Sequence, residues 1–356
     1  MSVVVINFNG GALLTGCLER VRAQTHPASE IIVVDNRSTD GSPETIRQRF
    51  SDVRLIESPE NVGYAKAANV AIRETTSPYL MLLNPDVLLT PTFLAELVRV
   101  AVDRPEAGSF TGKLLRRSHG AGPPIIDSAG HEMFRNRWVV NRGEDQEDLG
   151  QYDRVEEVFG VCGAAPLYRR AMLEDVRVAD QAFAESFFLY LEDVDLDWRA
   201  RLRGWNAYYV PTAVAYHERG FKTGSRSRDG AILRHAVKNR YLMMLRNDSA
   251  ADLLFDAWSV VPSEVLRALD FALWSPRSLR GYLGIWRLLR QTLSERRAIR
   301  QGMRTSRREM RRWLGGAPDR RQVAARLRWL FASRRAAWDS RVPEPQRQAP
   351  SPSIGS

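Results

Sequence analysis

The first 90 residues alternate short apolar runs with segments of helical periodicity. The runs, rich in β-branched and large aliphatic residues, are SVVVINF (2–8), IIVVD (31–35), VRLIES (53–58) and YLMLLNPD (79–86). Between them, apolar residues recur at helical spacing over 13–24, 42–50 and 63–75. Strands that alternate with helices form a parallel sheet with helices on its faces. The sequence therefore predicts an α/β fold: a Rossmann-like, mainly parallel sheet with helices on both faces.

Polar residues follow three of these predicted strands. Asp35 ends the second, Asn61 begins the turn after the third, and Asn84-Pro85-Asp86 closes the fourth. Ligands of such sheets bind beyond the carboxyl ends of the strands, so we expect a ligand site there. Each motif also has a structural alternative, because Asp35 can form an Asx-turn and Asn84 to Asp86 can form a plain turn.

A second acidic cluster lies within FFLYLEDVDLDWRARLRGW (187–205), where four acids occupy the six positions from Glu192 to Asp197. They follow an apolar run. Three interpretations are open: the solvated first turn of a helix, a metal site, or a general base. His217 ends AVAYH, 24 residues after Asp193. A lone histidine is more often structural, but an imidazole at a strand end near acids suits a metal.

Beyond residue 90 the pattern changes. We expect a helix over 92–102, a loop-rich region over 112–160, a strand then a helix over 161–173, two short strands over 207–217, and helices after 229. The final segment, VPEPQRQAPSPSIGS, has the composition of a disordered tail. We therefore divide the chain into 1–222, 223–335 and 336–356, with the first part split into halves 1–97 and 98–222.

The C-terminal region is basic. The chain has a formal net charge of +10, and 18 arginines against three acids lie between Arg277 and Arg335. Such a segment favours an anionic partner, either nucleic acid or a membrane surface. Its aromatic residues lie among leucines at helical intervals rather than on a base-stacking platform, so we expect no nucleic acid and keep nucleic-acid binding as an alternative function.

Apolar residues between 252 and 289 also fall mainly at helical spacing, with Pro262 expected to break the run and Arg280, Arg287 and Arg290 beside it. This pattern is typical of helices that lie on an anionic membrane surface. The alternative is that these helices pack on the N-terminal part of the chain (1–222) with their arginines solvated.

The cysteine count, the N-terminal sequence and the lengths of the apolar runs indicate the cellular compartment. Two cysteines cannot build a disulfide framework, which fits a reducing cytoplasm. MSVVVINFNGG lacks a basic n-region, so we expect no signal peptide, and no run of 18 apolar residues predicts a spanning helix. We expect a cytoplasmic protein, peripheral at the inner face of the plasma membrane.

Taken together, the motifs resemble the family 2 inverting glycosyltransferases of type A fold, most closely the rhamnosyltransferase-like subgroup of cell-envelope polysaccharide synthesis. The residues that carry the resemblance are VVINFNG (4–10), IIVVDNRSTDGS (31–42), NVGYAKAAN (61–69), LLNPDVLL (82–89), CGAAPLYRRAM (162–172), FFLYLEDVDLDWRARLRGW (187–205) and YVPTAVAYH (209–217). The subgroup depends on IIDSAGHEMF (125–134) and KNRYLMMLRN (238–247). The resemblance implies this fold with a C-terminal helical extension.

The resemblance also assigns roles at the donor site. Asp86 matches the acid of the DXD motif that binds Mg²⁺ or Mn²⁺, and His217 matches a histidine that completes the metal site in some relatives. Asn84 stands where many relatives have the first Asp of that motif. The other residues implied at the nucleotide-sugar are Asp35 at the base, Ile6 and Asn7 beside it, Asn61, Lys66 and Asn69 on the next turn and helix, and Lys222 and Arg226 on a loop over the diphosphate.

Asp193 matches the catalytic base of the family. Inversion requires in-line attack by an acceptor hydroxyl that loses its proton, and a carboxylate suits that task. Glu192 would orient the acceptor, whereas Asp195 and Asp197 are expected to cap and solvate the helix.

The implied reaction moves a sugar, with rhamnose the best candidate, from a UDP- or dTDP-sugar to a saccharide or lipid-linked acceptor. A nucleotidyltransferase is a further alternative, but the glycines of VINFNGG lack the basic residues that such an enzyme needs there.

Overall fold

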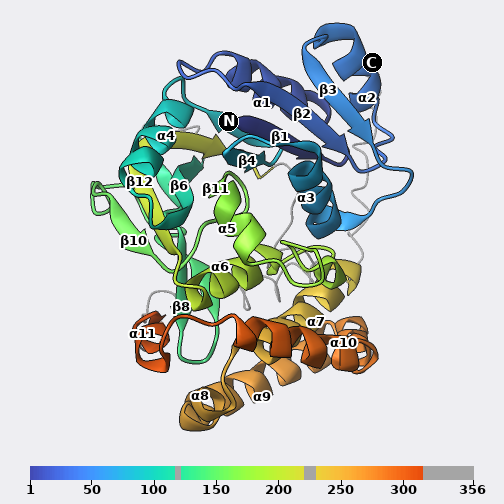
Figure 1. The fold of residues 1–356 in the computed structure, drawn as a ribbon. Coiled ribbons are helices and arrows are strands. Elements are labelled where there is room, and N and C mark those ends of the chain that lie inside the picture. The colour runs from blue at the N-terminus through green and yellow to red at the C-terminus, as the bar shows by residue number, and fades with distance from the viewer. Residues whose placement is uncertain (117–121, 220–229, 316–356) are drawn as a thin grey trace, which may run out of the picture. The chain divides into compact units, whose positions relative to one another are not determined.

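The computed structural model describes residues 1–116, 122–219 and 230–315 (Figure 1). Residues Met1–Gly315 form one compact unit. Lys222 and Arg226 lie outside the described residues, as does the tail 336–356. The division of the chain at residues 97, 222 and 335 stays a prediction.

The central element is a ten-stranded sheet with the order β10-β12-β6-β11-β4-β1-β2-β3, to which β5 and β7 add at β12 and β6. Its strands are β1 (Ser2–Asn7), β2 (Glu30–Asp35), β3 (Val53–Glu57), β4 (Tyr79–Leu83), β5 (Val87–Leu89), β6 (Ala107–Arg116), β7 (Ile125–Ser128), β10 (Glu156–Val158), β11 (Leu167–Arg169) and β12 (Asn206–His217). Strands β4, β1, β2 and β3 are parallel, as are β6 and β12, whereas β11 runs antiparallel between them. The predicted mainly parallel α/β sheet is confirmed.

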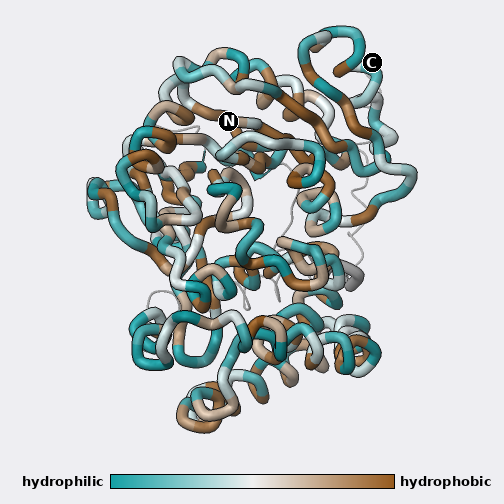
Figure 2. The backbone as a smooth tube through the Cα atoms, viewed as in Figure 1, coloured by the Kyte–Doolittle hydropathy of each residue, from teal (hydrophilic) through white to brown (hydrophobic). Residues whose placement is uncertain are grey.

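Helices cover both faces of this sheet (Figure 1). Helices α1 (Gly11–Arg22), α2 (Ser42–Arg49) and α4 (Phe93–Asp103) pack on the face that carries Val3 and Val5. Helices α3 (Gly63–Glu74), α5 (Arg170–Asp175) and α6 (Glu192–Leu202) pack on the face that carries Val4 and Ile6. Successive side chains of a strand point to opposite faces, which explains why β1 is apolar throughout. Figure 2 shows these strands as apolar segments near the N-terminus.

The region 112–160, expected to be rich in loops, contributes more strands than its composition predicts. It completes β6 and forms β7 and β10. It also forms β8 (His131–Phe134) and β9 (Val139–Asn141), which pair with β13 (Leu314–Gly315) in a second, three-stranded sheet. The two short strands expected over 207–217 are one strand, β12, whose pairing with β6 shifts register between Val210 and Val214. Pairing with neighbours that lie far away in the chain organises these segments.

The C-terminal helices are α7 (Gly230–Asn247), α8 (Ala250–Phe255), α9 (Ala257–Trp274), α10 (Gly281–Gln301) and α11 (Arg307–Arg312). A short 3₁₀ turn, η2 (Pro276–Arg280), joins α9 to α10, and another, η1 (Glu185–Phe187), precedes α6. Helices α7 and α10 pack under α6 in a third core cluster that includes Trp198, Leu242 and Ile299. Pro262 lies inside α9, so the break expected there does not occur. Within the described ranges, we find no helix with the length and apolar character needed to cross a membrane.

Candidate active site

The carboxyl ends of β4, β1 and β2 place the first group of predicted residues side by side, because these strands are neighbours in the sheet. The Asp35 carboxylate is buried, and it accepts hydrogen bonds from Asn7 Nδ2 (2.7 Å), Ser38 Oγ (2.6 Å) and the Ser38 backbone N–H (2.8 Å). Asn7 Oδ1 in turn accepts the Gly10 N–H. Ile6, just before Asn7, is buried in the core. Asp35 is thus fixed to β1 and to its own loop at the carboxyl edge of the sheet, through a backbone bond three residues on rather than the two of an Asx-turn.

Asp86 and His217 face each other at the same edge. Asp86 Oδ1 lies 3.4 Å from His217 Nε2 and is buried without a hydrogen-bond partner. His217 Nδ1 lies 2.8 Å from Asp127 Oδ2, and Asp127 also pairs with Arg116 and Arg219. Burial alone would lower the pKa of His217, but its hydrogen bond to Asp127 and the nearby charge of Asp86 raise that pKa to about 9.

This pair has the features of a two-residue cation site. An orphaned carboxylate oxygen and an imidazole nitrogen converge, and a second carboxylate orients the imidazole from behind, as carboxylates commonly do for metal-binding histidines. Among the residues that the structure describes, no cluster of three or more His, Cys, Asp or Glu side chains could hold a metal ion. A cation here would need its remaining ligands from a diphosphate or water.

A strained loop delivers the acidic cluster to the site. Phe188, Tyr190 and Leu191 all have positive φ (66°, 71° and 64°), which is unusual for residues other than glycine. Asn239 of α7 holds this loop, since its Nδ2 donates to the carbonyls of Phe187, Leu189 and Tyr190 at 2.7–2.9 Å. Helix α6 then begins at Glu192, which places Glu192 and Asp193 in its first turn.

The two acids at the start of α6 have different surroundings. Glu192 is buried and its Oε2 has no hydrogen-bond partner. Burial and then the charge of Asp193 raise the pKa of Glu192 well above its usual range, which favours its protonated form. Asp193 Oδ2 accepts the Gly163 N–H at 3.0 Å, and the next residue, Ala164, accepts the Asn84 N–H at 2.9 Å. Gly163 and Ala164 therefore link Asp193 to the Asn84–Asp86 turn through two backbone hydrogen bonds.

The expectation that Asp195 and Asp197 cap and solvate the helix is wrong, because both are buried. Asp195 accepts hydrogen bonds from Arg199, Arg246 and Asn247 at 2.7–2.9 Å. Asp197 accepts the Val161 N–H at 3.0 Å and pairs with His131 Nδ1 at 2.9 Å. Apart from Arg199, which belongs to α6 itself, the partners of these two acids come from parts of the chain that lie far from α6 in the sequence.

The remaining predicted residues lie around α3. Asn61 Oδ1 accepts the Gly63 N–H, and Lys66 is exposed. Asn69 is buried and uses its side-chain amide on the Phe183 backbone and on Glu185 Oε1. In this structure Asn69 thus fixes the loop before η1. For all three residues, contact with a nucleotide-sugar stays a prediction.

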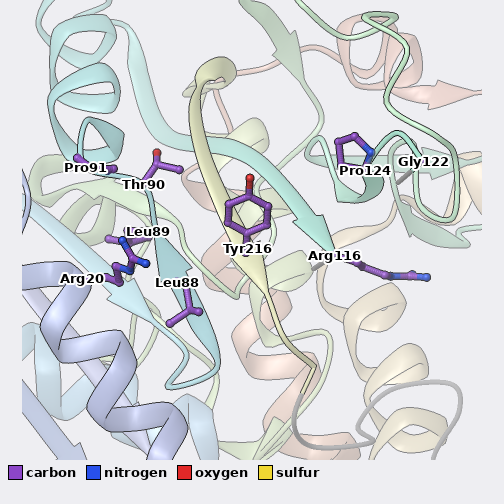
Figure 3. Close-up of a pocket in the computed structure, with 9 residues that line it drawn as sticks. All are labelled: Arg20, Leu88, Leu89, Thr90, Pro91, Arg116, Gly122, Pro124 and Tyr216. Atoms are coloured by element: carbon purple, nitrogen blue, oxygen red, sulfur yellow. The ribbon is translucent and has the colours of Figure 1, made fainter. Parts of the chain in front are cut away.

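A cavity of about 440 Å³ lies beside β5 and β12, lined by Arg20, Leu88, Leu89, Thr90, Pro91, Arg116, Gly122, Pro124 and Tyr216 (Figure 3). None of the predicted site residues lines it. Tyr216 and His217 are neighbours on β12, so their side chains point to opposite faces of that strand. The cavity is therefore separate from the Asp86–His217 pair.

Sequence reasoning did not assign roles to Asp127, His131 or Arg219. Asp127 and His131 do fall in IIDSAGHEMF, the segment noted as a feature of the subgroup. Their spacing of four residues in a region with weak periodicity indicates no chemistry by itself. Only the fold brings Asp127 to His217 and His131 to α6.

Comparison with known proteins agrees with this arrangement. The sequence model of glycosyl transferase family 2 matches residues 2–177. N-acetylglucosaminyl-diphospho-decaprenol L-rhamnosyltransferase of Mycobacterium tuberculosis is 30% identical over 247 residues, which are 63% of this chain and 78% of that protein. Poly-beta-1,6-N-acetyl-D-glucosamine synthase of Staphylococcus aureus is 21% identical over 215 residues, 59% of this chain and 47% of that protein.

Two solved structures share the fold. GalNAc-T7 with UDP, GalNAc and Mn²⁺ superposes with a TM-score of 0.53 at 13% identity, over 69% of this chain and 47% of that chain. TarS of S. aureus superposes with a TM-score of 0.53 at 15% identity, over 85% of this chain and 52% of that chain. Identities this low show the fold alone, and this chain spans about half the length of each.

These matches confirm the resemblance predicted from the motifs, including its rhamnosyltransferase-like character, and they favour an enzyme over the nucleic-acid-binding and nucleotidyltransferase alternatives. The chain belongs to glycosyl transferase family 2 and is a glycosyltransferase.

Proposed function

We propose that this enzyme transfers a sugar, with rhamnose the best candidate, with inversion from a UDP- or dTDP-sugar to a saccharide or lipid-linked acceptor in cell-envelope polysaccharide synthesis. The name of the mycobacterial relative supports both the sugar and an acceptor built on a polyprenyl diphosphate. The observation that supports the proposal is that Gly163 and Ala164 link Asp193 to the Asn84–Asp86 turn through two backbone hydrogen bonds, and that Asp86 in this turn faces His217.

The donor would bind along the carboxyl edge of β4, β1 and β2. Asp35, presented beside Ile6 and Asn7, would contact the nucleotide base. Asn84 would contact the donor next to the cation, and Asn61, Lys66 and Asn69 would lie along its other side. Lys222 and Arg226 belong to the same proposal but lie outside the described residues.

A divalent cation, Mg²⁺ or Mn²⁺, would be held by Asp86 and His217, and when bound it would neutralise charge that develops on the leaving diphosphate. The orphaned Asp86 Oδ1 fits this role. Asp127 keeps the His217 ring aimed at Asp86 through Nδ1, so that Nε2 is the nitrogen that faces the site.

Asp193 would take the proton of the acceptor hydroxyl as that oxygen attacks the anomeric carbon. The Gly163 N–H fixes the carboxylate through Oδ2. Glu192, kept protonated by burial, could donate a hydrogen bond to the acceptor and orient it. A new glycosidic bond forms, the bond to the diphosphate breaks, and the proton stays on Asp193 until the product leaves.

The assignment of the base is tested with Asp193→Asn. We expect transfer to fall by about 10²-fold or more, whereas the affinity for the nucleoside diphosphate stays within a fewfold of wild type, because the base acts only on the acceptor. The control is Glu174→Gln, an exposed acid on α5. Near-normal turnover by Asp193→Asn would refute the assignment.

The donor and the cation are tested with a panel of nucleotide-sugars, each with Mg²⁺ or Mn²⁺, in which release of nucleoside diphosphate is measured. Asp86→Ala should abolish the cation dependence of diphosphate binding in calorimetry, and His217→Ala should weaken it. Unchanged cation dependence in both variants would show that the pair is structural.

We also propose that the C-terminal helices bind an anionic membrane surface on its cytoplasmic side. One face of these helices packs on the protein, whereas large apolar side chains on the other are more than half exposed: Leu254, Phe255, Trp258, Val261, Val265, Leu266, Leu269, Leu273, Leu283 and Trp286. Arg280, Arg287 and Arg290 are exposed beside them. Exposed tryptophan and leucine flanked by arginine suit the headgroup boundary of anionic lipids, where a lipid-linked acceptor would be found.

Vesicle flotation tests the membrane proposal. The full chain should float with anionic vesicles and be released by high salt, and the double variant Leu266→Glu/Trp286→Glu should stay in the bottom fraction. Leu149→Glu, which changes an exposed leucine between β9 and β10, is the matched control. Flotation of the double variant equal to that of the control would refute the membrane proposal and leave the catalytic one intact.

A further inference from the structure

Helix α6 carries a cluster of acids around Asp193, the proposed base. Glu192, Asp193 and Asp197 lie within six residues, and two of them are buried. Burial raises the pKa of Glu192 well above its usual range and raises that of Asp197 to about 6. A neighbouring carboxylate and a dry environment both favour the protonated form of an acid. A carboxylate that acts as a base in such surroundings needs a positive charge close by.

His131, at the start of β8, lies between Asp193 and Asp197. Its Nδ1 pairs with Asp197 Oδ2 at 2.9 Å, and its Nε2 faces Asp193 Oδ2 at 3.7 Å. The contact with Asp197 is a hydrogen bond, whereas the contact with Asp193 is longer and is an ion-pair contact. Among the ion pairs of the described residues, His131 is the cationic partner of Asp193.

The backbone next to His131 leaves room for its contact with Asp197. The His131 N–H donates to the Gly160 carbonyl at 2.8 Å, and a Cβ on Gly160 would lie 1.9 Å from Asp197 Oδ2. A side chain at position 160 would therefore displace Asp197. The ring is 6% exposed, so solvent screens its charge little.

We propose that His131 is a positioning residue for Asp193: clamped by Asp197, its imidazolium keeps the Asp193 carboxylate ionised and oriented for proton transfer. This inference depends on Asp193 being the base, as proposed above. Burial alone would lower the pKa of His131, but the bond to Asp197 and the charge of Asp193 raise it, which favours the imidazolium. The other titratable groups around the three residues are Glu192, Tyr64, Tyr168, Cys162 and Arg201. Of these only Arg201 is a cation, and its interaction is with Asp197.

The test is the pH dependence of kcat at saturating donor and acceptor, whose acidic limb reports the pKa of the base in the substrate complex. Removing a neighbouring cation raises the pKa of a carboxylate by about 1–3 units. In His131→Gln the acidic limb should therefore move upward by about 1–2 pH units, and kcat should recover to within a fewfold of wild type above the limb. The KM for the donor should stay unchanged. An unshifted limb with kcat lowered equally at every pH would overturn the inference.

Asp197→Asn is the second variant. It keeps an oxygen for His131 Nδ1 but removes the charge that supports the imidazolium, so its limb should shift in the same direction. Because both variants act through one group, the double variant should shift no further than His131→Gln. Additive shifts would contradict the clamp. His26→Gln, at a half-buried histidine between α1 and β2, is the control.

One measurement needs no variant of the cluster. The protein has five histidines, and NMR of the folded wild-type protein can follow their ring protonation individually. His131 should be protonated at pH 7, and a neutral ring would refute the inference even if both variants failed to fold. Failure of the proposed function would have a different outcome. If Asp193→Asn stayed active, the assignment of Asp193 as the base would be refuted. If Asp193→Asn were inactive but the acidic limb of His131→Gln did not shift, only the role proposed for His131 would be refuted.

Discussion

Replacing Asn239 by alanine should damage catalysis from a distance. Asn239 is fully buried, and its two Nδ2 hydrogens serve the carbonyls of Phe187, Leu189 and Tyr190. The net contribution of a hydrogen bond is about 1 kcal/mol, so the loss is about 2–3 kcal/mol. Three residues of this loop have positive φ, and such strain costs about 1 kcal/mol or more each. The two quantities are similar, so the variant loop has little to keep it in its strained form.

The expected result combines a stability effect with a rate effect. A loss of about 2–3 kcal/mol lowers Tm by roughly 3–4 °C for a chain of this size. Relaxation of the loop moves the start of α6, and a misplacement of about 1 Å costs about 10²-fold in rate. We therefore expect kcat to fall by about 10- to 100-fold, with a smaller change in donor KM, because Asn239 contacts the loop that leads to the proposed base and none of the proposed donor residues that the structure describes.

Calorimetric unfolding and sugar transfer, measured together, decide this prediction. Gln301→Ala, which truncates an exposed amide at the end of α10, is the control and should change neither quantity. A lower Tm with unchanged kcat would show that the loop holds its shape without Asn239. No change in either measurement would show that water replaces the amide.

Three further predictions concern stability. Asp195→Asn should destabilise the protein by about 3 kcal/mol or more, because it leaves two buried arginines without their carboxylate. Burial raises the pKa of Asp195 but its arginine partners lower it below its usual value, so its contribution is present above pH 4 and is lost as pH falls through the folded pKa; acid unfolding curves of the variant should be flatter in that range. Gly63→Ala should cost about 1–3 kcal/mol and lower kcat, since φ is 78° there and a Cβ would lie 2.5 Å from the Phe188 carbonyl oxygen. Arg137→Leu should cost about 3–5 kcal/mol in chemical unfolding, because buried Asp248 loses its arginine and buried Asp256 keeps only Arg311, whereas Arg99→Leu at an exposed pair should leave the unfolding midpoint nearly unchanged.

The sequence by itself determined the fold of the first 90 residues. Periodicity and β-branched runs located β1 to β4 and the helices between them to within a few residues, because each element forms from local spacing. The positions of Asp35 and Asp86 followed from the same pattern, since the carboxyl ends of parallel strands meet at one edge of the sheet.

Only the tertiary structure decided which charges are buried and what they face. Asp195 and Asp197 have the spacing of a solvated helix start, yet their partners Arg246 and His131 lie 51 and 66 residues away. His217 and Asp127 are 90 residues apart. A carboxylate is stable inside a protein only when such partners surround it, and local sequence carries no record of residues that the chain brings together through packing.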